Sequence, residues 1–300
     1  MNLLLEILLF LATLVYSYLE AFVKLFVPVR RKSVSGELVL ITGAGHGVGR
    51  ATALEFAKRQ SRLVLWDINK HGVEETAAEC KSLGATVEAF VVDCSKREEI
   101  YSAAEKVGQQ GHGQRLTQTQ SICRKVGKTG EEALHTNHAR PWNLLTPCCS
   151  LYAEAFLPAM MNNNYGHIVT VASVAGHFGT SFMVAYCSSK FAAVGFHKAL
   201  TEELSTLGKD GIKTTCLCPV FINTGFVKNP RIRLGRILEI KEVVEALMEG
   251  IVTNQKMVFV PPQLNIAWLS EMVFPERALN VLKKLTVPKF DAVIGQRSTQ

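Results

Sequence analysis

Three side chains near the middle of the chain have the types and spacing needed to take a proton from an alcohol. Tyr186 and Lys190 are four residues apart, so a helix would place them on one face, where the lysine ammonium favours the tyrosinate. A tyrosinate can then act as a general base. Ser173 ends an apolar run thirteen residues earlier, and its hydroxyl could hold the substrate oxygen. The same spacing also arises by chance on solvated helix faces, so neighbouring motifs must support this interpretation.

A glycine-rich segment has the pattern of a site for the phosphates of a dinucleotide. It follows a predicted strand at 37–41 and opens a predicted helix at 47–59. Glycines permit a tight turn and let backbone N–H groups approach a pyrophosphate, and the helix N-terminus adds a favourable dipole. The alternative is a glycine turn without a ligand. The candidate cofactor-binding residues are Thr42, Gly43, Gly45, Gly47, Val48 and Gly49.

Two aspartates follow the next two predicted strands, 62–66 and 86–92. The Asp67 carboxylate is placed to accept both ribose hydroxyls and would repel a 2′-phosphate, and no arginine is adjacent to it. This pattern favours NAD over NADP as the cofactor. Asp93 could bind the adenine of the same cofactor, although it could equally cap the helix that follows.

The order of elements from residue 37 onward predicts an α/β fold. Short β-rich runs alternate with helical stretches, which indicates βαβ units and a doubly wound Rossmann parallel sheet. The length of 300 residues and the apolar share of 48% suit a single domain, 37–300. Further strands are expected at 167–172, 213–218 and 257–260, and further helices at 71–83, 96–106, 182–206 and 240–252.

Taken together, these motifs resemble the short-chain dehydrogenase/reductase family over 1–106 and 155–300. The resemblance implies that Ser173, Tyr186 and Lys190 are catalytic. It also implies that Tyr186, Lys190 and the segment from Pro219 to Thr224 contact the NAD cofactor. The activity it implies is NAD-dependent oxidation of an apolar substrate, a 17-beta-hydroxysteroid, retinoid or other lipid alcohol, by hydride transfer. The implied location is the endoplasmic reticulum membrane and lipid droplets, and homodimers formed through the long catalytic helix are usual.

The first 28 residues differ from the rest of the chain because 21 of them are apolar. Their uncharged run, 7–19, is shorter than the roughly 20 residues that a spanning helix needs. The run lacks a preceding positive charge and a small-residue cleavage site, unlike a signal peptide. We therefore expect 1–28 to be a retained anchor within one leaflet of a membrane or on a lipid droplet. The basic linker 29–36 would then face the anionic cytosolic surface, with a spanning helix and a cleaved or buried segment as the alternatives.

Charge and cysteine spacing argue against several other partners. The net charge of +7 is dispersed, and no basic stripe interleaved with aromatic residues suggests nucleic acid. The eight cysteines show no metal-ligand spacing, so we expect no metal site and reduced thiols that face the cytosol. The apolar segment Gln263–Phe274 is interpreted as a lid over an apolar substrate, with ordinary packing or a second membrane contact as alternatives.

The segment 107–154 is atypical for this fold. No three consecutive residues within 107–150 are apolar, whereas buried parallel strands read as continuous apolar runs. We therefore expect the central strand to be missing here. The family's N-N-A-G motif is absent, and Asn143 lies two residues away from Leu145, where the asparagine of the family's catalytic tetrad would fall. That asparagine is consequently not assigned.

Two origins are open for the atypical segment. One is a local change of reading frame, or a misjoined exon, and the other is a divergent surface insertion. The missing strand would give an alternative function, a catalytically impaired protein associated with lipid droplets. A third possibility, a secreted carrier, would require cleavage of 1–28.

Overall fold

The computed structural model describes residues 3–24, 26–27, 30–110, 116–121, 146–180, 183–222, 237–264 and 274–278. Contacts divide the chain into two units, Met1–Ser33 and Val34–Gln300, which are described separately. In the first unit, the helix α1 (Leu3–Lys24) exposes large apolar side chains along its length, among them Leu8, Phe10 and Leu19. Within the described residues, no helix combines the length and the apolar character that crossing a membrane requires.

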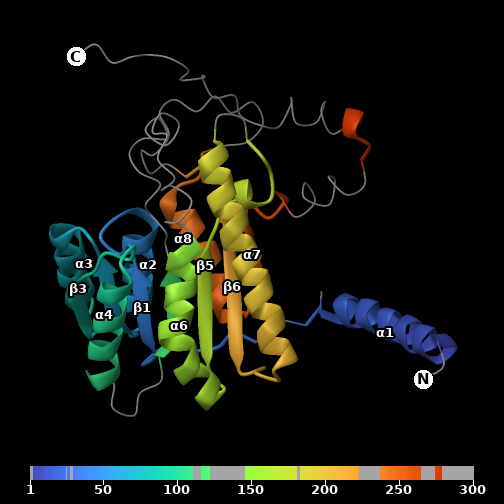
Figure 1. The fold of residues 1–300 in the computed structure, drawn as a ribbon, viewed down its shortest axis with the longest axis horizontal. Helices are drawn as coiled ribbons and strands as arrows, with labels where there is room; N and C mark the ends of the chain where they lie inside the picture. Colours follow the sequence, from blue (N-terminus) through green and yellow to red (C-terminus); the bar gives the residue numbers. More distant parts are fainter. Residues whose placement is uncertain are drawn as a thin grey trace. The chain divides into compact units, whose positions relative to one another are not determined.

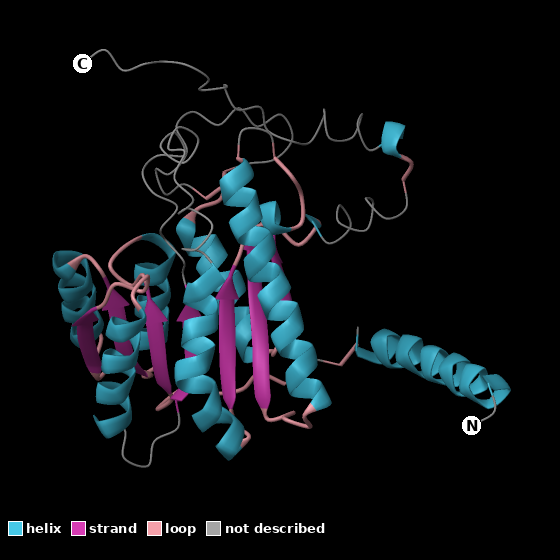
Figure 2. Cartoon of the chain, in the orientation of Figure 1, coloured by secondary structure: helices cyan, strands magenta, loops and turns pink. Residues whose placement is uncertain are grey.

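The second unit is built on a parallel sheet, as the alternation of elements predicts. Within the described residues the strand order is β3-β2-β1-β4-β5-β6-β7, and each neighbouring pair is parallel (Figure 2). The order reverses between β1 and β4, and ligands of such sheets bind beside the carboxyl ends of the strands at this point. The strands are β1 Leu38–Thr42, β2 Arg62–Asp67, β3 Val87–Val91, β4 Leu116–Ser121, β5 Gly166–Val171, β6 Ile212–Pro219 and β7 Met257–Val260.

Helices cover both faces of the sheet, which makes the fold doubly wound (Figure 1). α4, α6 and α7 pack against one another in sequence order on one face, while α2 contacts α3 and α8 on the other. Their ends lie within one or two residues of those expected, apart from α4, which continues four residues beyond the expected end at 106, and α6, for which the sequence predicts no helix. The helices are α2 Gly47–Lys58, α3 Lys70–Ser82, α4 Arg97–Gln110, α6 Thr146–Asn163, α7 Val184–Thr206 and α8 Ile240–Val252, with a short 3-10 helix η2 Val174–Gly176.

The expectation that the central strand is missing is wrong. β4 pairs with β1 on one side and with β5 on the other, so the sheet is continuous through the atypical segment. Its sequence, LTQTQS, contains no apolar run, but two threonines give it β-propensity, and the two flanking strands supply backbone partners. The pairing with β1 shifts register between Leu38 and Val39.

The core lies in layers on the two faces of the sheet. β1 is buried along its whole length, and its side chains alternate between the layers. Val39 and Ile41 pack in the layer under α2, α3 and α8, while Leu38 and Leu40 pack with Trp66 and residues of α4 and α6. This burial fixes the carboxyl end of β1, from which the glycine loop departs.

Candidate active site

The glycine loop between β1 and α2 adopts the conformations that its glycines permit. Gly43 has φ +65° and Gly47 φ +58°, in the left-handed region that side chains with a Cβ rarely adopt. Gly47 also begins α2, so the turn delivers backbone directly to a helix N-terminus. Val48 packs partly against the core, while Thr42 and Gly49 are buried. These features fit the phosphates of a dinucleotide, whose negative charge a helix N-terminus favours.

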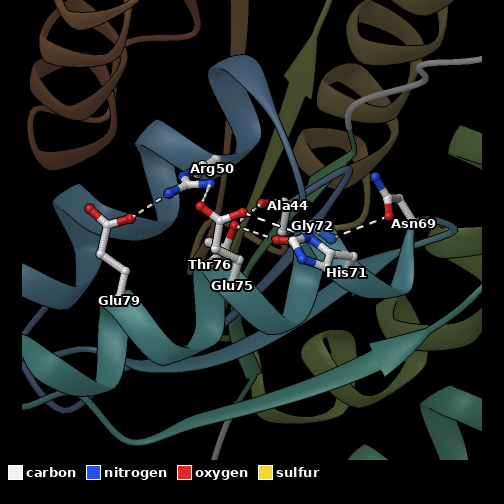
Figure 3. A network of polar contacts seen from close by, with 8 residues as sticks. All are labelled: Ala44, Arg50, Asn69, His71, Gly72, Glu75, Thr76 and Glu79. Atoms are coloured by element: carbon white, nitrogen blue, oxygen red, sulfur yellow. Dashed lines mark hydrogen bonds and ion pairs between the residues drawn. The ribbon is translucent and has the colours of Figure 1, made fainter.

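The start of α3 approaches this loop closely. A Cβ at Gly72 would lie 2.7 Å from the carbonyl oxygen of Gly45, so only glycine fits there. The Thr76 hydroxyl lies 3.0 Å from the carbonyl oxygen of Ala44 and 2.9 Å from that of Gly72. Asn69 caps α3 by accepting a hydrogen bond from the Gly72 N–H (Figure 3). Sequence reasoning did not identify Gly72 or Thr76, and a glycine in the first turn of a helix was the available signal.

An ion-pair cluster joins α2 to α3 beside the same loop. The Arg50 guanidinium lies 2.8 Å from Glu75 and 2.8 Å from Glu79, and it crosses from one helix to the other (Figure 3). The hydrogen bond that Arg50 donates to Glu75 raises the pKa of Arg50 and lowers the pKa of Glu75. The guanidinium of Arg50, the residue after the glycine motif, is therefore paired with two carboxylates of α3.

Asp67, at the end of β2, is tied directly to the glycine loop. It is buried, with 3% of its surface exposed, and one carboxylate oxygen accepts the N–H of Gly45 at 2.8 Å. The other oxygen accepts the N–H of Asn69 at 2.9 Å. A carboxylate offers about four acceptor positions, so lone pairs remain for ribose hydroxyls. A Cβ at Gly45 would lie 3.0 Å from the same carboxylate, which explains the glycine.

The contacts of Asp93 are those expected if it caps the following helix, the alternative to binding adenine. Its carboxylate accepts the backbone N–H of Ser95 at 3.0 Å and the hydroxyl of Ser95 at 2.7 Å. Its own N–H donates to Glu99 in α4 at 2.7 Å. The side chain therefore shapes the turn into α4, and contact with adenine stays a prediction.

Ser173 lies two residues beyond the end of β5 and caps η2. Its hydroxyl donates to the carbonyl of Pro219 at 3.2 Å and accepts the N–H of Ala175 at 3.2 Å. The residue is 8% exposed. The turn after β5 is thereby connected to the carboxyl end of β6.

Tyr186 and Lys190 share a face at the start of α7, as their spacing predicts. The Lys190 ammonium lies 5.7 Å from the centre of the Tyr186 ring, within the range of a cation–π contact. It also donates to the carbonyl of Val171 at the end of β5, at 3.2 Å, and the residue is 9% exposed. The structure thus brings the lysine to the tyrosine and to the strand that leads into Ser173.

Some predicted site residues lie outside the described part of the chain. These are Thr224, the position of the tetrad asparagine, and 265–273 of the expected lid. Among the residues that the structure describes, no three histidine, cysteine or carboxylate side chains form a group able to hold a metal ion.

Comparisons with known proteins agree with this geometry. A family model described as short chain dehydrogenase matches residues 37–233. Estradiol 17-beta-dehydrogenase 11 of Pongo abelii is 57% identical over 298 residues, 99% of each chain. The 17-beta-hydroxysteroid dehydrogenase 13 of Homo sapiens is 54% identical over 311 residues, again 99% of each chain. A solved short chain dehydrogenase/reductase from Burkholderia phymatum, in complex with NAD, shares the fold with a TM-score of 0.67 at 20% identity, covering 87% of this chain and 100% of that one.

Proposed function

The chain belongs to the short-chain dehydrogenase family and is therefore an oxidoreductase. We propose that it oxidises an apolar alcohol, first of all a 17-beta-hydroxysteroid, with NAD. Relatives at 53–57% identity over nearly the whole chain carry 17-beta-dehydrogenase names, which supports a steroid substrate. Retinoids and other lipid alcohols share the same chemistry, a hydroxyl on an apolar body. The observation that carries the proposal is the meeting of Lys190 with Tyr186 at the end of β5.

In this proposal each side chain has one role. Tyr186 takes the proton of the substrate hydroxyl, and the Lys190 ammonium lies beside its ring. The Ser173 hydroxyl holds the substrate oxygen, which requires its proton to turn away from Pro219. A nicotinamide cofactor, when bound, supplies the hydride acceptor. Without Tyr186 the alcohol proton has no base.

NAD is preferred to NADP in this proposal because of charge. The Asp67 carboxylate is buried against the glycine loop, where it would repel a 2′-phosphate. Arg50, the residue that directly follows the glycine motif, is paired with Glu75 and Glu79. No compensating positive charge is therefore supplied by that arginine.

The experiment is NADH formation by the purified full chain with estradiol, retinol and a long-chain alcohol. Tyr186→Phe should lower kcat by at least about 100-fold, because general-base catalysis contributes on the order of 10²–10⁴. Cofactor affinity should stay unchanged. Tyr101→Phe is the matched control, since that hydroxyl bonds Glu154 on the exposed surface of α4 and α6. Turnover retained by Tyr186→Phe would refute the assignment.

We propose also that 1–28 holds the enzyme on the endoplasmic reticulum membrane or a lipid droplet, with the dehydrogenase domain in the cytosol. The exposed apolar surface of α1 supports this, because such surface binds the lipid interface. The full chain should float with phospholipid vesicles and with phospholipid-coated triglyceride droplets, and a chain lacking 1–28 should stay in solution. Equal flotation of both forms would contradict the anchor.

A homodimer formed through α7 belongs to the same proposal. Val184 and Phe191 of this helix expose 69% and 46% of their surface, which a second subunit could cover. Light scattering of the chain without 1–28 should give twice the monomer mass. A monomeric mass at micromolar concentration would exclude a stable dimer.

The second candidate is a catalytically impaired protein of the droplet surface. The observation in its favour is that the residues after β4 read Ile122-Cys123-Arg124-Lys125, where the family motif N-N-A-G is expected. The two candidates differ in turnover, since the impaired protein would float with droplets but form no NADH with any alcohol of the panel.

A further inference from the structure

A cluster of two cysteine sulfurs and one imidazole lies between β6 and the turn that follows Ser173, and it has no role in the proposed reaction. The Cys218 sulfur is 3.5 Å from Nε2 of His177 and 3.7 Å from the sulfur of Cys216. Both cysteines are fully buried, and His177 is 8% exposed. The sequence explains only part of this, because alternate residues of β6 share a face, whereas His177 comes from another segment.

The cluster joins the same two segments that Ser173 joins. Cys218 directly precedes Pro219, whose carbonyl accepts the Ser173 hydroxyl. His177 follows η2, four residues after Ser173, and its ring packs against Phe259 with ring centres 5.1 Å apart. The turn that carries Ser173 is thus attached to β6 at both of its ends.

The turn also packs against α7. A Cβ at Gly176 would lie 2.5 Å from the carbonyl oxygen of Lys190, so η2 packs directly on the backbone of the helix. The turn from Ser173 to His177 therefore lies between the catalytic helix and the end of β6. A change in its contact with β6 would move Ser173 relative to Lys190.

The neighbours of Cys218 lower the pKa of its thiol, whereas burial alone would raise it. The hydrogen bond from Cys216 lowers the pKa of Cys218 to about 6, against the opposing effect of burial, and His177 and Lys190 act in the same direction. Cys80, a buried cysteine of α3, shows the contrast, since burial raises its pKa to about 12.

We propose that Cys218 and His177 are positioning residues, which hold the turn after β5 so that the Ser173 hydroxyl faces the substrate oxygen. The inference rests on the proposed role of Ser173. Neither residue touches the substrate in this assignment, and both act through Ser173. Their loss should therefore slow turnover more than it weakens NAD binding, because the glycine loop and Asp67 follow the neighbouring strands β1 and β2 rather than β5 and β6.

The test compares kcat, KM and the dissociation constant of NAD for full-length variants with estradiol as substrate. Cys218→Ala and His177→Ala should each lower kcat about tenfold or more, while the affinity for NAD stays within about twofold. His177→Gln, whose amide can donate from a similar position, should recover most of the rate. Cys80→Ala is the matched control, because it empties a similar buried volume far from Ser173 and should leave kcat unchanged. Cys218→Ser keeps the size of the side chain if Cys218→Ala does not fold.

A double-mutant cycle decides whether the effect passes through Ser173. In a Ser173→Ala background, Cys218→Ala or Cys218→Ser should cost no further kcat, because the hydroxyl that they position is gone. Losses that multiply in the double variants would overturn the proposal, as would a wild-type kcat in all the Cys218 and His177 variants. The proposed function fails separately, if Ser173→Ala and Tyr186→Phe themselves keep wild-type turnover.

Discussion

At the residue scale, the close approach of two backbone segments decides which side chains are allowed near the cofactor loop. Gly45 lies between Asp67 and Gly72, and an added Cβ at either glycine would meet backbone or the carboxylate within about 3 Å. The sequence showed Gly45 through its motif. Gly72 carries no such motif, and its requirement arises only where α3 meets the loop.

Gly72→Ala should therefore destabilise the protein and weaken NAD binding. Its Cβ would lie 2.7 Å from the Gly45 carbonyl, and overpacking of this kind costs about 1–3 kcal/mol. Urea unfolding and NAD titration measure the two effects. Gly195→Ala is the control, since nothing lies within 4 Å of its Cβ in α7, and it should stabilise by about 0.5–1 kcal/mol. Unchanged stability and affinity for Gly72→Ala would contradict the contact.

A buried histidine makes the stability depend on acid. Burial lowers the pKa of His197 to about 4, below the ordinary value of 6.5. Because the folded state holds the neutral imidazole, its stability is complete above pH 6.5 and is lost as the pH falls from 6.5 through 4. The loss from this residue should be on the order of 3 kcal/mol, by the conversion of about 1.4 kcal/mol per pKa unit.

Unfolding measured between pH 7 and pH 4 checks this expectation. His197→Gln should show a shallower decline than the unsubstituted chain, whatever its stability at pH 7. His71→Gln serves as the control, because the His71 side chain is 90% exposed. Parallel declines for the chain with and without His197 would show that another group is responsible.

At the element scale, β4 decides whether the domain is whole. Its local sequence is too polar to predict a buried strand, yet its backbone is paired along both edges. The pattern of apolar runs failed here because it counts side chains, whereas β4 is placed by hydrogen bonds to β1 and β5. The frame-change or misjoined-exon hypothesis stays a prediction, which sequencing of the transcript would test.

A proline in β4 should therefore be far more harmful than one at the sheet edge. Thr119→Pro removes an N–H from a strand with neighbours on both sides, and the ring fits a central strand poorly. We expect loss of the folding transition in a thermal melt. The control is Ala89→Pro in the edge strand β3. Backbone groups of Thr86 and Val92 form hydrogen bonds to β2. Because backbone N–H groups alternate in direction along a strand, the N–H of Ala89 points away from β2. A normal melt for Thr119→Pro would show that β4 contributes little.

At the scale of the whole molecule, the stability gained on binding NAD tests whether the cofactor-binding part of the domain is folded. The glycine loop, Asp67 and α3 form one connected set of contacts, so a chain that folds around them should gain stability from NAD. At a free concentration of 100 times the dissociation constant the gain is about 2.7 kcal/mol. A thermal melt with NAD should shift upward by about 5–10 °C for a domain of this size.

NADP at the same concentration should give a much smaller shift, because the Asp67 carboxylate repels its phosphate. Asp67→Asn keeps an oxygen for the Gly45 N–H and removes the charge. It should therefore lower the ratio of the NADP and NAD dissociation constants at least about tenfold. Equal shifts with NAD and NADP in the unsubstituted chain would contradict the preference. No shift with either would favour the catalytically impaired alternative.

The sequence alone determined the features that depend on neighbours along the chain. The glycine motif, the alternation of strands and helices, and the four-residue spacing of Tyr186 and Lys190 are local patterns, and local geometry turns each of them into structure. The apolar character of 1–28 is of the same kind.

Only the tertiary structure decided which distant residues meet. Ser173 and Pro219 are 46 residues apart and His177 and Cys218 are 41 apart, so no spacing rule links them. β4 became a strand because β1 and β5 offered partners on both sides, which its own polar sequence could not indicate. Contacts between separate elements satisfy backbone and side-chain groups that local patterns leave open, and here they complete the sheet and fix the turn that carries Ser173.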